Sequence, residues 1–210
     1  MNFIITFTIL YGLIPLFFYH TVKNKLKNIR AIYPFIIVVF IASLYEFIGT
    51  EILKINASYW FFAYSLISFY SIIYFYRQIL DNKFKSLFRT IHFLFLLLLI
   101  VLFFVKKMLI IGLFPIFDAY ITVVVIVLSV LWFKKIFQQL NYKTLWANHI
   151  FYYVFGLIMY HCGTIFLFLL MEMIYNDNKG MLQYYWLLNV ALNLILRTLL
   201  ILGIWKAQVK

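Results

Sequence analysis

Seven long apolar runs make up most of this 210-residue chain, and short polar segments separate them. A helix needs about 20 mostly apolar residues to cross a bilayer, because it rises about 1.5 Å per residue and the hydrocarbon core is about 30 Å thick. The runs cover residues 3–22, 31–50, 58–80, 90–105, 115–133, 150–174 and 184–205. They predict an all-α integral membrane protein, in which residues 1–210 form a single transmembrane domain built as a seven-helix bundle.

The composition supports this fold class. Hydrophobic residues make up 67% of the chain, whereas soluble domains are about 45–50% apolar. A chain of this length cannot bury so much apolar surface in water, because small domains keep a large fraction of their surface exposed. We therefore expect membrane lipid to be the solvent and the first partner of the folded chain.

The three prolines fit helices that begin or bend at them. Pro34 and Pro115 lie at the start of an apolar run, where the missing N–H of proline costs nothing. Pro15 lies in the middle of the first run, and we expect it to kink that helix.

Basic residues gather in alternate polar segments and predict the orientation of the bundle. Of the 18 Lys and Arg residues, 13 fall in the first, third, fifth and last polar segments, four fall in the other segments, and Arg197 lies inside an apolar run. Cytoplasmic loops of membrane proteins carry such an excess. The bias predicts a multi-pass protein of the cell inner membrane, with its amino terminus outside and its carboxyl terminus inside.

The cytoplasmic basic residues form a candidate surface for a protein partner or for lipid. The surface consists of Lys23, Lys25, Lys27, Arg30, Lys83, Lys85, Arg89, Lys134, Lys135 and Lys143. Anionic headgroups attract each such residue by about 1 kcal/mol, and a cytoplasmic protein would meet the same loops. Because the charge sits in short loops, we expect no direct sequence-specific binding of nucleic acid.

A faint internal repeat relates the two halves of the chain. Residues 44–50 (LYEFIGT) resemble residues 159–164 (MYHCGT), and the runs that follow begin with Tyr-Trp in both cases. The pattern fits a 3+1+3 arrangement, in which a fourth helix joins two parallel repeats of three helices. Chance similarity between aromatic-rich helices is the competing explanation.

Five polar residues inside the apolar runs form a candidate intramembrane polar site. They are Glu46, His161, Asn189, Asn193 and Arg197. An ionisable side chain at the centre of a membrane helix costs about 2.5–3.5 kcal/mol, so its position is informative. Glu46 lies about one turn inside the outer end of its run, where it either faces the bundle or is hydrated.

Asn189, Asn193 and Arg197 are spaced four residues apart and share one helix face. This face should point into the bundle, because amide and guanidinium groups facing lipid would be unpaired. The stripe could line a water-filled path, bind an anion or join helices by hydrogen bonds. For Arg197 we expect backbone carbonyls, Tyr hydroxyls or an anionic lipid as partners. Glu46 is a poor partner if it lies in the outer half, since the two residues then differ in depth.

His161 lies near the middle of the sixth run, beside a face of small and polar residues. That face includes His149, Tyr153, Gly156 and Tyr160, and it is typical of a seam where two membrane helices pack. His161 is either a neutral, hydrogen-bonded side chain or a proton-sensitive gate.

The sequence lacks the motifs of the common enzyme classes. It contains no HExxH, no Gly-rich phosphate loop, no GxSxG and no paired Cys and His at metal-binding spacing. The lone cysteine, Cys162, lies inside an apolar run and offers no disulfide partner. We therefore expect a protein that is not an enzyme and that carries no cofactor or metal.

Four short segments resemble a group of small Bacteroidetes-type seven-helix membrane proteins. The segments are residues 43–47 (SLYEF), 132–135 (WFKK), 160–164 (YHCGT) and 195–200 (ILRTLL), the last followed by Trp205-Lys206. Some members of this group look like membrane modules in signalling, and others look like the accessory proteins encoded beside type VI-B CRISPR RNA-guided RNases. The second resemblance implies antiphage defence, in which the protein modulates the RNase or acts on the membrane.

Two other functions are compatible with the same sequence. One is a seven-helix sensor or receptor module coupled to a separate cytoplasmic regulator, and the other is a small transporter or pore. Each of the three functions is compatible with a homo-oligomer.

Overall fold

The computed structural model describes residues 2–22, 27–55, 58–80, 84–105, 114–139, 145–169 and 179–208. These ranges are helical and contain no strand. The α-helices are α1 (Asn2–Tyr11), α2 (Ile14–Val22), α3 (Tyr33–Tyr45), α4 (Ser58–Ile79), α5 (Lys85–Val105), α6 (Phe114–Gln139), α7 (His149–Leu169) and α9 (Lys179–Gln208). The π-helix η2 (Glu46–Ile52) continues α3, and the short 3-10 helices η1 (Lys27–Ala31) and η5 (Leu145–Ala147) precede α3 and α7. The prediction of an all-α fold is confirmed for this part of the chain.

Each predicted run forms one helix or a pair of helices, and several helices continue into the polar flanks. Helix α5 begins at Lys85 rather than at residue 90, and α6 runs on to Gln139. Helix α9 begins at Lys179, five residues before its apolar run. The backbone N–H and C=O groups at a helix end have no partner within the helix, and lipid tails offer no hydrogen bonds to them. Extending the helix moves its unpaired ends away from the apolar zone, so boundaries taken from hydropathy alone are too short.

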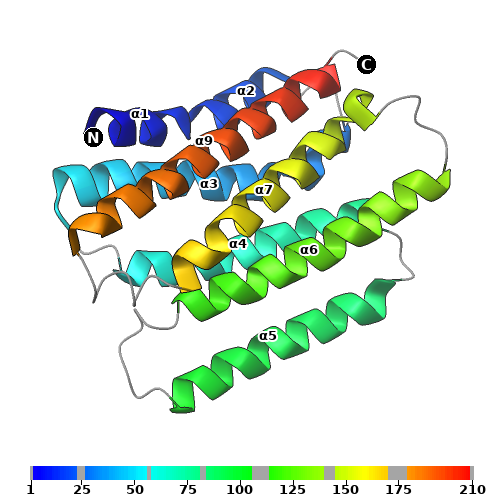
Figure 1. The fold of residues 1–210 in the computed structure, drawn as a ribbon. Coiled ribbons are helices and arrows are strands. Elements are labelled where there is room, and N and C mark those ends of the chain that lie inside the picture. The colour runs from blue at the N-terminus through cyan, green and yellow to red at the C-terminus, as the bar shows by residue number, and fades with distance from the viewer. Residues whose placement is uncertain are drawn as a thin grey trace.

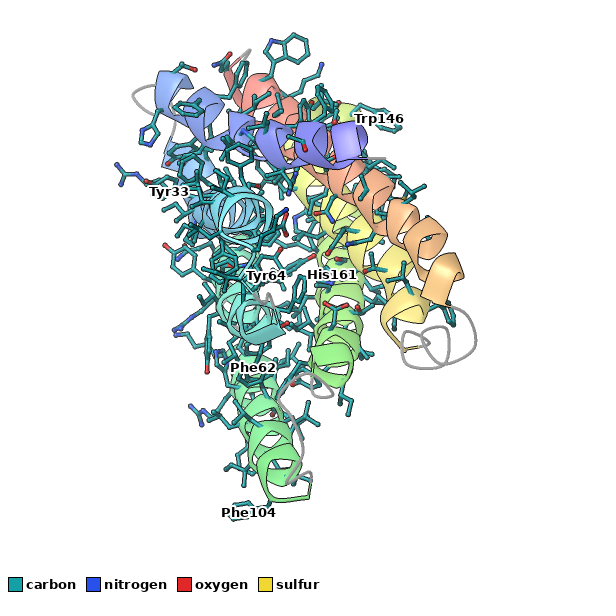
Figure 2. All side chains as sticks on the ribbon, turned by 90° about the vertical axis from the view of Figure 1, so that its left-hand side faces the viewer. Tyr33, Phe62, Tyr64, Phe104, Trp146 and His161 are labelled. Atoms are coloured by element: carbon teal, nitrogen blue, oxygen red, sulfur yellow. The ribbon has the colours of Figure 1, made fainter. Side chains whose placement is uncertain are left out.

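Among the described residues, three helices are long and apolar enough to cross a membrane, over residues 116–138, 149–167 and 187–208. The outside of the bundle is also apolar, since Phe104 is 75% exposed and Phe166 is 71% exposed. Phe104 points away from the bundle at the free edge of α5 (Figure 2). Extended exposed apolar surface marks contact with lipid or a partner, and together with the three long helices it supports a membrane protein.

The helices lie side by side and run alternately in opposite directions (Figure 1). The carboxyl ends of α2, α4, α6 and α9 therefore lie at one end of the bundle, and the amino ends of α1, α4, α6 and α9 lie at the other. The most extensive contact between described elements is that of α7 with α9, followed by that of α6 with α7. Helices α1 and α2 lie along α9, and α3 lies along α4.

Helix α5 lies at the edge of the bundle and is attached by aromatic side chains (Figure 1). The Phe95 ring is fully buried and stacks on Phe69 of α4 at 3.8 Å. The Tyr120 hydroxyl of α6 donates a hydrogen bond to the Ile91 carbonyl at 2.7 Å. Most other large side chains of α5 face outward, including Phe93 and Phe104, so this helix contributes little to the interior of the bundle.

Small residues allow α7 and α9 to approach closely, as the sequence predicts for this face of α7. A Cβ on Gly163 would lie 2.6 Å from Leu192, and a Cβ on Gly203 would collide with the Tyr153 ring. Gly156 lies against Leu196 and Leu199 of α9 in the same way. Close approach of backbones strengthens van der Waals packing, which has to hold membrane helices together where lipid tails remove the hydrophobic driving force.

Candidate polar site within the bundle

Helix α9 carries the polar stripe that the sequence predicts, and the stripe faces inward. Asn189 is 8% exposed and Arg197 is 4% exposed. The Asn193 amide nitrogen donates to the Asn189 carbonyl at 3.0 Å and to the Asn189 side-chain oxygen at 3.1 Å. The two asparagines therefore satisfy part of each other's hydrogen-bonding capacity within one helix.

The stripe borders a small cavity of about 50 Å³. The lining residues are Val39, Ala42, Glu46, Trp60, Phe61, Tyr64, Tyr160, Asn189, Asn193 and Arg197. They come from two walls, one formed by α3, η2 and α4 and the other by α7 and α9. Because one water needs about 10–15 Å³, the cavity has room for about three to five water molecules.

Glu46 reaches the cavity from the first residue of the π-helix η2. The wider turn is visible in the bond from the Leu53 N–H to the Ile48 carbonyl, five residues back, at 2.9 Å. π-Helical turns are rare and occur frequently at functional sites. Next to Glu46, the Tyr45 ring stacks on Trp60 of α4 with centroids 4.4 Å apart, which ties the start of η2 to the opposite helix.

The structure brings Glu46 and Arg197 to one cavity, although the sequence made Glu46 a poor partner in the case that it lies in the outer half. Both side chains line the same cavity, and their opposite charges interact electrostatically. The two residues meet because α3 with η2 forms one wall of the cavity and α9 forms the other.

Arg197 is anchored to the first helix by a backbone carbonyl, which is one of the kinds of partner that we expected for it. Its Nη1 donates a hydrogen bond to the Thr8 carbonyl, and this carbonyl also accepts from the Gly12 N–H at 3.2 Å. The guanidinium Nε has no hydrogen-bond partner among the described residues. The Nη1 atom of the guanidinium is thus fixed to α1, and the Nε–H group can still donate a hydrogen bond.

The first predicted helix is divided rather than merely kinked. Helix α1 ends at Tyr11, Gly12 and Leu13 form a turn, and α2 begins one residue before Pro15. A Cβ on Gly12 would collide with the Ser43 hydroxyl and lie 2.7 Å from Arg197 Cζ. The glycine therefore leaves the space that the buried guanidinium occupies, and the break brings the end of α1 beside it.

His161 does not belong to this cavity. It is 4% exposed on α7, and its backbone carbonyl accepts from Thr164 and from Thr122 of α6, each at 3.4 Å. Its Nδ1 has no hydrogen-bond partner among the described residues. Figure 2 labels His161 beside Tyr64, but only Tyr64 lines the cavity. Of the five residues of the candidate site, the structure therefore brings four together and separates His161.

The candidate basic surface is described only in part. Arg30, Lys85, Arg89 and Lys134 are exposed. Lys135 is half-buried, and its Nζ donates to the Ile79 carbonyl at 3.0 Å, at the carboxyl end of α4. A cation at this position complements the helix dipole, which gives Lys135 a structural role. Lys23, Lys25, Lys83 and Lys143 lie outside the described residues, and only the backbone of Lys27 is described.

Comparisons with known proteins give no relative. No protein-family model, curated protein or solved structure matches the chain. Among the described residues, no group of three His, Cys, Asp or Glu side chains could hold a metal ion. The site is therefore interpreted from its own geometry.

Sequence reasoning did not assign three aromatic members of the cavity wall, namely Trp60, Phe61 and Tyr64. They lie on α4, whose sequence is aromatic throughout, so periodicity could not separate cavity-lining positions from lipid-facing ones. Gly12 was missed as well. Its position three residues before Pro15 was the available signal, since glycine followed by proline is a common break in a helix.

Replacing Gly12 with alanine should destabilise the protein, because the new methyl group would displace both Ser43 and the Arg197 guanidinium. We expect the free energy of unfolding in detergent to fall by about 1–3 kcal/mol, the usual cost of overpacking a buried site. Gly49→Ala is the matched control, since its nearest neighbour would be the Tyr45 ring at 3.3 Å. Equal stability of the two variants would show that Gly12 does not make room for Arg197.

Proposed function

We propose that the chain spans the inner membrane seven times, with its amino terminus outside and its carboxyl terminus in the cytoplasm. The alternating helix directions support this, because they place the carboxyl ends of α2, α4, α6 and α9 together (Figure 1). The exposed cations Lys85, Arg89 and Lys134 lie near this end, on α5 and α6. Segregation of basic residues to one end is the pattern expected at a cytoplasmic face.

The proposal extends to a 3+1+3 organisation with α5 as the joining helix. Its support is the position of α5 at the edge of the bundle, between the chain segments α1–α4 and α6–α9 in the sequence (Figure 1). The polar cavity lies between these two segments, since Glu46 belongs to one and Arg197 to the other. Transporters built from repeats place their sites at the same kind of boundary.

A pair of reporter fusions tests the topology. A reporter that works only in the cytoplasm should be active when it is joined after Lys210. A reporter that works only outside the membrane should be active when it is inserted at Asn178, because we expect the last helix to cross the bilayer between these two positions. Activity of both fusions on the same side would remove that helix from the set of spanning segments.

We further propose a non-enzymatic accessory role in antiphage defence of the type VI-B CRISPR kind, in which the bundle modulates the RNA-guided RNase or acts on the membrane. The observation that carries a switching role is the shared cavity of Glu46 and Arg197, because two opposite charges between two helix groups can bias their relative position. The resemblance of the sequence supplies the defence context. A signal arriving at the cavity would reach the basic residues of α6 through α9 and α7, which pack against each other, and through the contact of α7 with α6.

A membrane sensor coupled to a different cytoplasmic regulator is the second candidate. The same cavity favours it, since the space beside Arg197 is large enough for a small ligand. The two candidates differ in the partner that responds. Dependence of the cellular effect on a CRISPR RNase supports the first, whereas an effect retained without that RNase supports the second.

Variants of the polar pair and of the basic surface test the role in cells that carry the RNase and a targeted phage. Glu46→Gln and Arg197→Leu should insert normally and change phage protection by about 5–150-fold, the range of ordinary coupling energies. Lys85→Glu combined with Arg89→Glu should have a similar effect through loss of the partner surface. Lys54→Glu, an exposed cation at the other end of the bundle, is the matched control.

Well-inserted Glu46→Gln and Arg197→Leu variants that protect normally would contradict a switching role. The polar pair would then serve only to join helices, and apolar replacement of such a pair is often neutral for stability.

A further inference from the structure

We propose that the cavity is a binding site for a small zwitterion, such as an α-amino acid of about the size of glycine. The inference rests on the proposed role of the cavity as a switch and names the class of ligand that would operate it. The ammonium group would face Glu46 and the aromatic side chains of α4, and the carboxylate would face Arg197 and the amides of α9.

The charge of the lining selects this class. Glu46 lies on the wall formed by η2 and α4, and Arg197 lies on the opposite wall formed by α9 and α7. A simple anion would meet the repulsion of Glu46, and a simple cation would meet that of Arg197. A ligand with both charges gains attraction from each wall, and in a site of low dielectric constant each attraction is stronger than in water.

The wall of α9 offers donors for a carboxylate. The guanidinium of Arg197 has five N–H groups in a fixed fork that matches a carboxylate. Nη1 contacts the Thr8 carbonyl, while Nε has no partner among the described residues. Asn193 and the Tyr160 hydroxyl, which interact with each other, complete this wall.

The opposite wall offers an environment for an ammonium group. Glu46 lines the cavity together with Trp60 and Tyr64 of α4. The face of an aromatic ring attracts a cation, and tryptophan does so most strongly. Trp60 is held in place by its stack on Tyr45, so the wall does not need to be ordered when a ligand binds.

The size of the cavity limits the ligand. A cavity of about 50 Å³ holds about three to five water molecules, and so a ligand of about five heavy atoms. Glycine has this size, whereas the side chains of larger amino acids would have to displace Phe61 or Val39 from the lining. Waters released from the cavity would add to the affinity where they are poorly ordered.

Thermal unfolding of the full chain in lipid nanodiscs tests the proposal, with glycine as the probe. A ligand that binds the folded state raises the unfolding temperature in a saturable way. Acetate and methylammonium each carry one of the two charges, and we expect neither to reproduce the shift. Glu46→Gln should weaken glycine binding by about tenfold or more, since it removes one partner of a buried charge. Asp118→Asn, at a buried carboxyl outside the lining, should bind glycine normally.

Three results would overturn the proposal: no saturable shift with glycine, an equal shift with acetate or methylammonium alone, or unchanged binding to Glu46→Gln. Should Arg197 variants fail to fold, Glu46→Gln and Asn193→Leu carry the test, because each removes a polar group that lines the cavity. The cellular assay separates this proposal from the switching role. If the unaltered chain does not bind glycine but Glu46→Gln loses protection, only the ligand is contradicted. If the unaltered chain binds glycine and Glu46→Gln weakens that binding but protects normally, only the switch is contradicted.

Discussion

The permanent charge of Arg197 is the constraint on which the interior of this bundle depends. A guanidinium stays protonated in proteins, so it cannot escape an apolar environment by losing its proton. The hydrocarbon core of the bilayer offers the guanidinium no partner, and an unpaired buried charge is costly. In the structure, a backbone carbonyl of α1 accepts a hydrogen bond from the guanidinium, Gly12 leaves space for it, and it lines a cavity together with Glu46.

Several irregular features of the fold follow from this requirement. The Thr8 carbonyl that accepts from the guanidinium lies in the last turn of α1, just before the turn at Gly12, and the π-helix begins at Glu46 on the other side of the cavity. The glycine at the turn leaves the space that the guanidinium occupies. Irregular backbone is tolerated at membrane depth where it is buried in protein or lines a cavity, and both irregular segments meet that condition.

Hydropathy was sufficient to predict the helices and the inward-facing stripe of α9, because both depend on the local sequence. The stripe follows from the spacing of Asn189, Asn193 and Arg197 alone. The shared cavity could not be predicted in that way, since it depends on which helices pack around it. Glu46 reaches it from η2 and Arg197 reaches it from α9, and no local spacing relates these two segments. The position of His161 could not be predicted either. The sequence places this polar residue inside the bundle, but it lies at the contact of α6 with α7 and not at the cavity.

The most direct test of this account is a double-mutant cycle between Glu46 and Arg197, read as the free energy of unfolding in detergent. The cycle would compare Glu46→Gln, Arg197→Leu and the double variant with the unaltered chain. Residues that share one polar site should show an interaction energy of about 0.5–3 kcal/mol. Effects that add within about 0.3 kcal/mol would mean that the two charges do not interact and would contradict a common site.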